Sequence, residues 1–300
     1  MKILITGGTG QVGFELQRSF QLHGECVAPC RDELNLYDTN AVDTYLGLHQ
    51  PDLILNAAAF TAVDLAETEV DQARRLNAEL PKQLADYCQK HGSSIVHYSS
   101  DYVYPGTGDQ LWLEDSPTAP QNTYGQTKLD GDQAIIASGC EHLIFRTSWV
   151  YSARGHNFMK TMLKLAKDRQ TLSIVKDQMG SPTAARLIAQ VTALAVAHEH
   201  QPHHQFHQNL FRIPVGLYHL APRGETSWQG FAEAIFAQAR TLGVSLAIQE
   251  VKGISSSDYP TPAKRPLNSR MNLQKLETAL GLQLPSWQQA LSLTIQEYLA

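Results

Sequence analysis

The feature that most constrains this chain is a glycine-rich stretch near its first residue, TGGTGQVG from Thr6 to Gly13. An apolar run, Lys2 to Thr6, precedes it, and a segment with helical periodicity, Gln11 to His23, follows it. Glycine permits a tight turn, lets the backbone approach a pyrophosphate and lets the helix pack closely on the strand. The free N–H groups of the first helical turn would then face the phosphates. An ordinary glycine-rich turn is the alternative, but the context predicts a dinucleotide site at Gly7, Gly10, Gln11, Val12 and Gly13.

The remainder of the first half alternates short apolar runs with amphipathic stretches. Such alternation is typical of a doubly wound parallel sheet with helices on both faces. Ligands bind these sheets beyond the carboxyl ends of the strands. We therefore predict a Rossmann-like α/β domain over residues 1–150. Its expected strands are Glu25–Pro29, Leu53–Leu55, Ser94–Tyr98 and His142–Arg146, and its expected helices are Ala41–His49, Val70–His91 and Tyr124–Ala137.

The pattern is less regular after residue 150. Proline-rich turns at 259–262 and 265–266 separate the later elements. We expect residues 151–300 to form mainly a smaller substrate-binding lobe over the mouth of the sheet, although part of this chain can return to the first domain. Its predicted elements are the strand Leu172–Val175 and the helices Asn157–Asp168, Ala184–Ala197, Thr226–Leu242 and Trp287–Leu299.

Composition excludes several classes of protein. The chain has 300 residues, 43% of them hydrophobic, which is enough for a substantial core. A formal net charge of -5 argues against a nucleic-acid partner. No apolar segment approaches the roughly 20 residues that span a bilayer, and the first apolar run is too short for a signal peptide. Four cysteines without CxxC spacing indicate free thiols in a reducing compartment. We expect a cytoplasmic protein that binds neither membrane nor nucleic acid.

The end of the second predicted strand bears on the choice of dinucleotide. It reads Ala28-Pro29-Cys30-Arg31-Asp32. A carboxylate here would accept a hydrogen bond from a ribose 2′-hydroxyl, whereas an arginine would receive a 2′-phosphate. Because both residue types are present, NADH and NADPH both stay open, and Arg31 favours NADPH.

Two polar stretches supply groups for proton transfer. YSSDYVY, residues 98–104, follows a predicted strand, and Tyr124 and Lys128 lie four residues apart at the start of a predicted helix. That spacing places both side chains on one helix face. Free tyrosine has a pKa near 10, and a nearby ammonium lowers it. A polar edge strand and a solvated helix face are the alternatives. About 110 residues after the glycine loop, however, the Tyr–Lys pair predicts a proton donor.

Over nearly its whole length the chain resembles the extended short-chain dehydrogenase/reductase family, and within that family it is similar to reductases of keto sugar nucleotides. The glycine loop and the Tyr–Lys pair are shared with epimerases and dehydratases, so the two matching stretches nearest the C-terminus are the most specific. The matching stretches are GGTGQVGFELQ (7–17), LNAAAFTAVDLAE (55–67), HYSSDYVYPGTGD (97–109), NTYGQTKLDG (122–131), LIFRTSWVYS (143–152), NFMKTMLKLAK (157–167), DQMGSPT (177–183) and YPTPAKRPLNSRMN (259–272).

The resemblance implies hydride transfer from NADPH or NADH to the ketone of a nucleotide-sugar substrate. Tyr124 would be the general acid, and Lys128 would hold the cofactor ribose and lower the pKa of Tyr124. Ser100, where the family more often has threonine, would donate to the same oxygen. Asp101 and Trp149 would contact the sugar. The resemblance further implies cofactor contacts at Cys30, Arg31, Asn35, Leu36, Ala59, Phe60, Thr61 and Tyr98, with Asn35 standing where the family often has an aspartate.

Some members of this group are dimers that hold Mg²⁺ with glutamates at the interface. Glu15 and Glu297 stand at matching positions, but Arg186 appears where another of those glutamates is expected. Because a cation at that place disfavours bound Mg²⁺, we expect no metal. Monomer and homodimer both stay open.

Two other functions fit parts of the resemblance. A related nucleotide-sugar epimerase would need a further acid or base, and none stands out at the strand ends. A non-catalytic regulatory subunit is the second alternative, since proteins resembling these reductases serve methionine adenosyltransferase in that way. The presence of Ser100, Tyr124 and Lys128 argues against a purely binding role.

Three weaker features have two readings each. Lys264, Arg265 and Arg270 could meet a diphosphate or could lie on a solvated turn. Trp228 and Trp287 are expected to pack in the core or within the second lobe. The histidine-rich segment could bind a transition metal, although a solvated surface loop is favoured. Its histidines are His198, His200, His203, His204 and His207.

Overall fold

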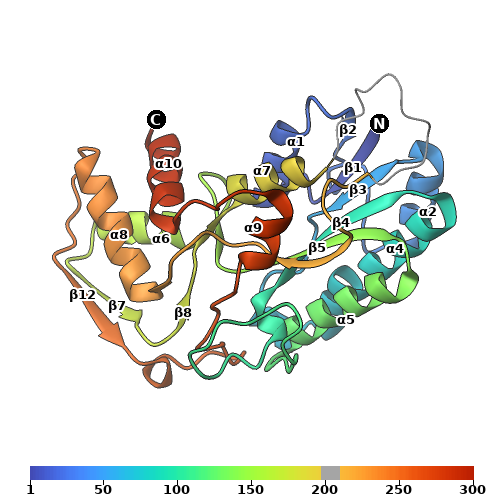
Figure 1. Cartoon of the computed structure of the whole chain (residues 1–300). Helices are drawn as coiled ribbons and strands as arrows, with labels where there is room; N and C mark the ends of the chain where they lie inside the picture. The colour runs from blue at the N-terminus through green and yellow to red at the C-terminus, as the bar shows by residue number, and fades with distance from the viewer. Residues whose placement is uncertain (197–209) are drawn as a thin grey trace.

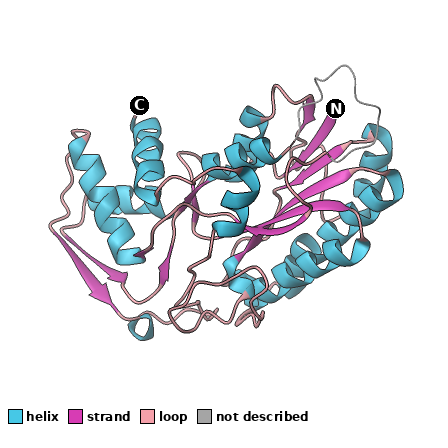
Figure 2. Ribbon diagram, in the orientation of Figure 1, coloured by secondary structure: helices cyan, strands magenta, loops and turns pink. Residues whose placement is uncertain are grey.

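A computed structural model describes residues 1–196 and 210–300 of the chain. A six-stranded sheet lies at its centre, and all of its paired strands are parallel (Figures 1 and 2). The order across the sheet is β10-β5-β4-β3-β1-β2. The predicted Rossmann-like sheet is therefore confirmed. Its strands are β1 (Lys2–Thr6), β2 (Glu25–Val27), β3 (Leu53–Asn56), β4 (Ser94–Ser100), β5 (Glu141–Thr147) and β10 (Gly216–His219).

Helices cover both faces of this sheet (Figure 1). Alternate residues of β1 show why, since Ile3 and Ile5 enter one buried apolar cluster while Leu4 enters another. Helices α1 and α7 supply the first cluster, and α2, α4 and α5 supply the second. The bounds of these helices are α1 (Gln11–Ser19), α2 (Thr39–His49), α4 (Leu80–His91), α5 (Thr123–Ser138) and α7 (Ala185–Ala195).

The strand order fixes the place of the ligand crevice. β1 pairs with β2 on one side and with β3 on the other, so the chain reverses its direction of winding at β1 and β3. In open parallel sheets the crevice for a ligand lies outside the carboxyl ends of the strands at such a point. The glycine loop follows β1 directly, and it therefore lies at this crevice.

One predicted helix, Val70–His91, is wrong as a single element. The structure has α3 (Val70–Arg74), a π-helical segment η2 (Arg75–Glu79) and then α4. Pro81 has no N–H, so it cannot make the α-helical hydrogen bond to the Asn77 carbonyl. A Cβ on Gly131 of α5 would overlap that carbonyl oxygen, so this glycine lets α5 approach the bulge closely. Bulges of this kind often occur at functional sites.

The other predicted helices are present with ends shifted by a few residues. Several begin after side-chain caps, as at Asp38, Asn122 and Asn157, whose oxygens accept N–H groups of the first turn. The helix predicted over Gln11–His23 ends at Ser19. Helix ends are therefore decided by local hydrogen bonds more than by apolar periodicity.

The second half of the chain builds a smaller lobe beside the sheet, on the left in Figure 1. Its two-residue strands have no periodicity, which is why the sequence did not reveal them. The division at residue 150 stays a prediction, because β10 returns to pair with β5 in the main sheet. The lobe contains α6 (Phe158–Ala166), α8 (Trp228–Thr241), α9 (Gln274–Leu280) and α10 (Trp287–Leu299), with paired strands β6 (Val150–Tyr151) and β9 (Thr183–Ala184), β7 (Thr171–Val175) and β12 (Glu250–Ile254), β8 (Met179–Gly180) and β11 (Thr226–Ser227).

Single turns of 3-10 helix are η1 (Leu65–Glu67), η3 (Asp101–Val103) and η4 (Ser256–Asp258). Throughout the described residues, no helix is both long enough and apolar enough to cross a membrane. The histidine-rich segment from His198 to His207 lies outside the described residues, so the choice between its two readings stays open.

Candidate active site

A cavity of about 680 Å³ opens over the carboxyl ends of the central strands. It is lined by the glycine loop, the ends of β4 and β5, the start of α5 and residues of the second lobe. The predicted site residues that line it are Gly7, Gly10, Gln11, Val12, Cys30, Arg31, Asn35, Leu36, Ala59, Thr61, Tyr98, Ser100, Asp101, Tyr124, Lys128 and Trp149. Gly13 and Phe60, also predicted as cofactor contacts, are not among the residues that line it.

The glycine loop has a shape that only glycine allows. Gly7 has a φ of +67°, and a Cβ there would lie 2.8 Å from the backbone nitrogen of Ala58. A Cβ on Gly13 would overlap the Gly7 carbonyl oxygen, which also accepts the Gly10 N–H at 2.9 Å. Gly10 caps α1 without a side-chain hydrogen bond. The first N–H groups of α1 are therefore left available for a phosphate.

The far end of the cavity lies beside β2. Cys30 and Arg31 line it, whereas Asp32 is not among the lining residues. The Glu33 carboxylate accepts the Cys30 N–H at 2.8 Å. Arg31 and the neighbouring Asp32 left the choice between NADPH and NADH open. Arg31 is thus the one of the two that lies beside the cavity.

The π-helical segment fixes the loop that follows β3. The Asn77 side chain accepts the Phe60 N–H at 2.9 Å and donates to the Phe60 carbonyl and to Thr127 of α5. The Phe60 ring itself is buried in the apolar core. Asn77 therefore holds the cofactor-side loop and α5 at a fixed separation. No spacing or motif in the sequence indicates this role.

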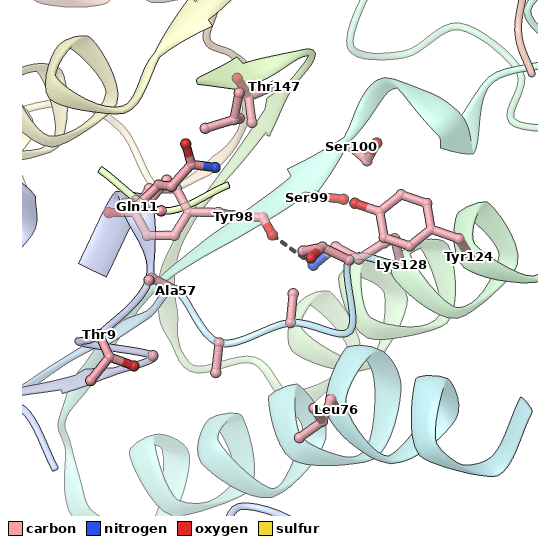
Figure 3. A pocket seen from close by; sticks show the side chains of 18 of the residues that line it. Thr9, Gln11, Ala57, Leu76, Tyr98, Ser99, Ser100, Tyr124, Lys128 and Thr147 are labelled. Atoms are coloured by element: carbon pink, nitrogen blue, oxygen red, sulfur yellow. Dashed lines mark hydrogen bonds between the residues drawn. The ribbon is translucent and has the colours of Figure 1, made fainter. Parts of the chain in front are cut away.

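Ser100, Tyr124 and Lys128 meet at the wall of the cavity, where Figure 3 shows the Tyr124 hydroxyl turned toward the end of β4. Burial raises the pKa of Tyr124 above its ordinary value, and a hydrogen bond with Ser100 acts in the opposite direction. Lys128 donates to the Tyr98 carbonyl at 2.6 Å. Burial lowers the pKa of Lys128 to about 8, while the charge of Asp132 opposes that change. The lysine can therefore change charge near neutral pH.

Asp101 lies immediately after the catalytic strand end. It is only 2% exposed, and burial raises the pKa of its carboxyl to about 6, against hydrogen bonds with Ser269 and Ser100. The Ser100 hydroxyl donates to Asp101 Oδ1 at 3.1 Å and accepts the Tyr102 N–H. A carboxyl of this kind can exchange hydrogen bonds with a polar ligand in either protonation state.

Two tryptophans close the other side of the cavity. Trp149 has a φ of +49°, unusual for a bulky residue, and its ring stacks on Trp228 with centroids 3.8 Å apart. A Cβ on Gly180 would lie 2.9 Å from the Trp149 ring, so the glycine makes room for this stack. Trp228 was expected only to pack in the core or within the second lobe. It does pack on Trp149, but it also lines the cavity.

Several other lining residues escaped the sequence reading. They share small or polar side chains without a spacing pattern, and only the resemblance could have pointed to them. They include Thr9, Ser99, Thr147 and Asn157. Two basic residues of the proline-rich turn are held in ion pairs, with Arg265 paired to Asp64 at 2.6 Å and Arg270 paired to Glu225 at 2.5 Å. Arg265 also hydrogen-bonds Tyr102, which lines the cavity.

The candidate metal glutamates hold an arginine between them. Arg186 Nε lies 3.1 Å from Glu15, and its terminal nitrogen lies 2.6 Å from Glu297. A guanidinium in this position supplies positive charge and no oxygen ligand, so the pair does not fit Mg²⁺. Within residues 1–196 and 210–300, no group of three or more His, Cys, Asp or Glu side chains could hold a metal ion.

The parallel sheet, the glycine cradle and the Ser–Tyr–Lys group at one cavity define a dinucleotide-dependent oxidoreductase of the short-chain dehydrogenase/reductase type. More narrowly, the chain belongs to the family described as the RmlD substrate binding domain, whose model matches residues 1–300.

Curated relatives agree with this membership. The dTDP-4-dehydrorhamnose reductase of Salmonella typhimurium is 46% identical over 296 residues, which cover 96% of this chain and 95% of the relative. The enzyme of the same name from Burkholderia thailandensis is 42% identical, with 100% of both chains covered.

Solved structures give the same result. A dTDP-4-dehydrorhamnose reductase from Clostridium acetobutylicum has a TM-score of 0.88 at 31% identity and full coverage of both chains. The Bacillus anthracis reductase, solved in complex with NADP, has a TM-score of 0.85 at 30% identity and 99% coverage of both. A UDP-glucose 4-epimerase from Thermus thermophilus, at 18% identity and a TM-score of 0.78, shares the fold.

Proposed function

We propose that this enzyme reduces the C4 ketone of dTDP-4-dehydro-L-rhamnose to the alcohol of dTDP-L-rhamnose, the last step of dTDP-rhamnose biosynthesis. The observation that carries the proposal is the meeting of Ser100, Tyr124 and Lys128 at one wall of a cavity whose other parts are a glycine cradle and an aromatic pair. The names of its relatives in Salmonella and Burkholderia support the substrate.

The cofactor is NADPH in this proposal. When bound, it supplies the hydride that reduces the ketone. Gly7, Gly10 and the first N–H groups of α1 would hold its pyrophosphate, because the backbone there is open and a Cβ at Gly7 would meet the chain after β3. Arg31 beside the cavity supports a 2′-phosphate, and the Bacillus anthracis relative is known with NADP.

The residues of this chain manage the proton. Tyr124 donates its hydroxyl proton to the oxygen of the reduced ketone. The Ser100 hydroxyl, which donates to Asp101 Oδ1 in this structure, turns to donate a hydrogen bond to the same oxygen. Lys128 has three N–H groups, and the Tyr98 carbonyl accepts one of them. Its positive charge favours the Tyr124 phenolate that remains after proton donation.

The two sides of the sugar site do different work. Asp101 presents a buried carboxyl for a sugar hydroxyl, and the stacked Trp149 and Trp228 give an apolar face that excludes water from the reacting carbon. We further infer that the enzyme works in the cytoplasm on a nucleotide sugar, as a monomer or a homodimer.

The test is turnover of freshly generated dTDP-4-dehydro-L-rhamnose with NADPH, followed by the absorbance of the reduced cofactor. Tyr124→Phe should lose about 10²- to 10⁴-fold in kcat while it keeps its affinity for NADPH, since the phenol ring stays and only its proton is lost. Tyr87→Phe is the matched control, because Tyr87 lies at α4 and donates only to the Leu46 carbonyl. A wild-type enzyme that leaves the ketone unreduced would refute the proposed function.

A further inference from the structure

Three polar residues form a row across the middle of the sheet. Thr6 of β1, Asn56 of β3 and His97 of β4 are register partners on neighbouring strands. Each is at most 1% exposed. Polar groups so deeply buried need hydrogen-bond partners. The mechanism above uses none of the three.

Hydrogen bonds join this row without a break and carry it to Lys128. Thr6 Oγ1 and Asn56 Oδ1 lie 2.7 Å apart, and Asn56 Nδ2 lies 3.0 Å from His97 Nδ1. His97 Nε2 lies 3.2 Å from Lys128 Nζ. At the other end, the Ala58 N–H donates to Thr6 Oγ1 at 3.2 Å. The row therefore links the loop after β3 to the lysine of the active site.

These hydrogen bonds can be satisfied in either direction. In the first direction Thr6 donates to the Asn56 oxygen, the Asn56 amide donates to His97 Nδ1, and His97 Nε2–H donates to an uncharged Lys128 amine. In the second direction the Lys128 ammonium donates to His97 Nε2, Nδ1–H donates to the Asn56 oxygen, and the amide nitrogen donates to Thr6. Imidazole and carboxamide groups each carry a donor and an acceptor, so both patterns join Asn56 to His97 and His97 to Lys128, with the Asn56 amide turned over in the second.

The surroundings of Lys128 make its change of charge costly without such a partner. Lys128 is 1% exposed, and Asp132, one turn further along α5, is the carboxylate that supports its charge. Asp132 is shared with Arg146 of β5, which it pairs at 3.0 Å. The other groups that face this region are the phenol of Tyr124 on α5 and the carbonyl of Tyr98 on β4, whereas the Tyr98 hydroxyl lies against Thr192 of α7.

The imidazole remains neutral in both patterns. Burial and the positive charge of Lys128 hold the pKa of His97 well below its ordinary range. The histidine can therefore exchange roles between donor and acceptor without taking up the proton itself. A hydrophobic residue in its place would leave Lys128 with one unsatisfied group in a buried site, which is unfavourable.

We propose that His97 is a positioning residue for Lys128. Held by Asn56 and Thr6, its neutral imidazole gives the lysine a hydrogen-bond partner in both charge states, so that the remaining N–H of Lys128 stays directed into the cavity. The inference rests on the proposed function, because it assigns Lys128 a change of charge during turnover.

The experiment compares His97→Leu and His97→Gln across a range of pH. Leucine removes the partner, and the ammonium loses more than the amine because hydrogen bonds to charged groups are the stronger ones. The alkaline limb of kcat/KM should therefore move to lower pH by about one unit, with a lower kcat. Glutamine can present either an oxygen or an N–H, so it should restore most of the wild-type profile. His142→Leu on β5 is the control and should keep the wild-type profile. The His142 ring hydrogen-bonds the Cys140 carbonyl and takes no part in the row that reaches Lys128.

Asn56→Asp supplies a second variant in which His97 itself is kept. A carboxylate at residue 56 accepts from His97 Nδ1–H and fixes Nε2 as an acceptor, which favours the ammonium. The alkaline limb should then move to higher pH. An unchanged limb in both His97→Leu and Asn56→Asp overturns the inference, and so does a glutamine variant that behaves like leucine.

The pH dependence of the Kd for NADPH gives a readout that needs no turnover. Lys128 holds the cofactor ribose in the proposed function, so the same variants should shift this profile in the same directions. An inactive wild-type enzyme whose NADPH affinity still shifts in this way would refute the proposed substrate and support the role of His97. Normal turnover with unshifted profiles would refute the role of His97 alone.

Discussion

The buried pair of Asp132 and Arg146 should be worth a large part of the stability of this protein. Asp132 is fully buried on α5, and its Oδ2 accepts Arg146 Nε at 3.0 Å. Arg146 also donates to the Tyr104 hydroxyl at 2.8 Å and is 4% exposed. Asp132→Asn keeps the shape of the side chain but leaves the guanidinium as an uncompensated charge in the core.

The size of the effect follows from this geometry. Two unit charges about 4 Å apart attract by roughly 4 kcal/mol at an effective dielectric constant of about 20. Removal of one partner from a buried pair costs about 3–5 kcal/mol, because the remaining charge keeps its desolvation penalty. Against a total stability of about 5–15 kcal/mol, this loss is large. We expect Asp132→Asn to lower the free energy of unfolding by about 3–5 kcal/mol.

Urea denaturation at neutral pH measures this difference. Asp130→Asn is the matched control, since Asp130 lies two residues away on the same helix and accepts only from Gln126 on the exposed side. Its variant should change the free energy of unfolding by less than about 0.5 kcal/mol. If Asp132→Asn and Asp130→Asn unfolded at the same urea concentration, the charge of Asp132 would add nothing to stability, and the reasoning would be refuted.

Two further predictions follow from the site. Burial raises the pKa of Asp101 from 3.8 to about 6, so the folded protein binds this proton more tightly than the unfolded chain does. The stability that the protonated carboxyl supplies is therefore complete below about pH 4 and is lost as pH rises through 6. Asp101→Asn should therefore gain roughly 3 kcal/mol in stability between pH 4 and pH 7 relative to wild type, and parallel curves of unfolding free energy against pH would contradict this. Gly13→Ala should weaken NADPH binding at least about tenfold, because the new Cβ meets the Gly7 carbonyl and displaces the phosphate loop. Calorimetric titration would measure that loss, while Gly47→Ala on α2, where a Cβ meets nothing, should bind NADPH normally.

The sheet and the main chemical groups could be predicted because they leave strong patterns in the sequence. Strands buried on both faces are short apolar runs, and their alternation with amphipathic helices identifies a parallel sheet. The glycine loop is recognisable because its shape excludes other residues. That Ser100 and Asp101 share a site with Tyr124 could be predicted from the family resemblance more than from the spacing of these residues.

The rest depends on contacts between residues far apart in the chain. Asn77 is one polar residue in a helical stretch. Only Pro81, four residues later, indicates that the helix is interrupted. Trp228 looks like a core residue because apolar periodicity cannot distinguish a wall of a cavity from its interior. His97 and Asn56 each end an apolar run, but their common row follows from strand register, which depends on the whole sheet.

The return of β10 to the sheet has a consequence for how the protein is made. During synthesis β5 is complete at Thr147, but its outer edge remains unpaired until Gly216–His219 has been added. At roughly 5–20 residues per second, that interval lasts several seconds or longer, and an unpaired edge strand readily joins other chains. The nascent enzyme therefore carries an aggregation-prone edge while the ribosome translates the stretch between β5 and β10, a little under half of the second lobe.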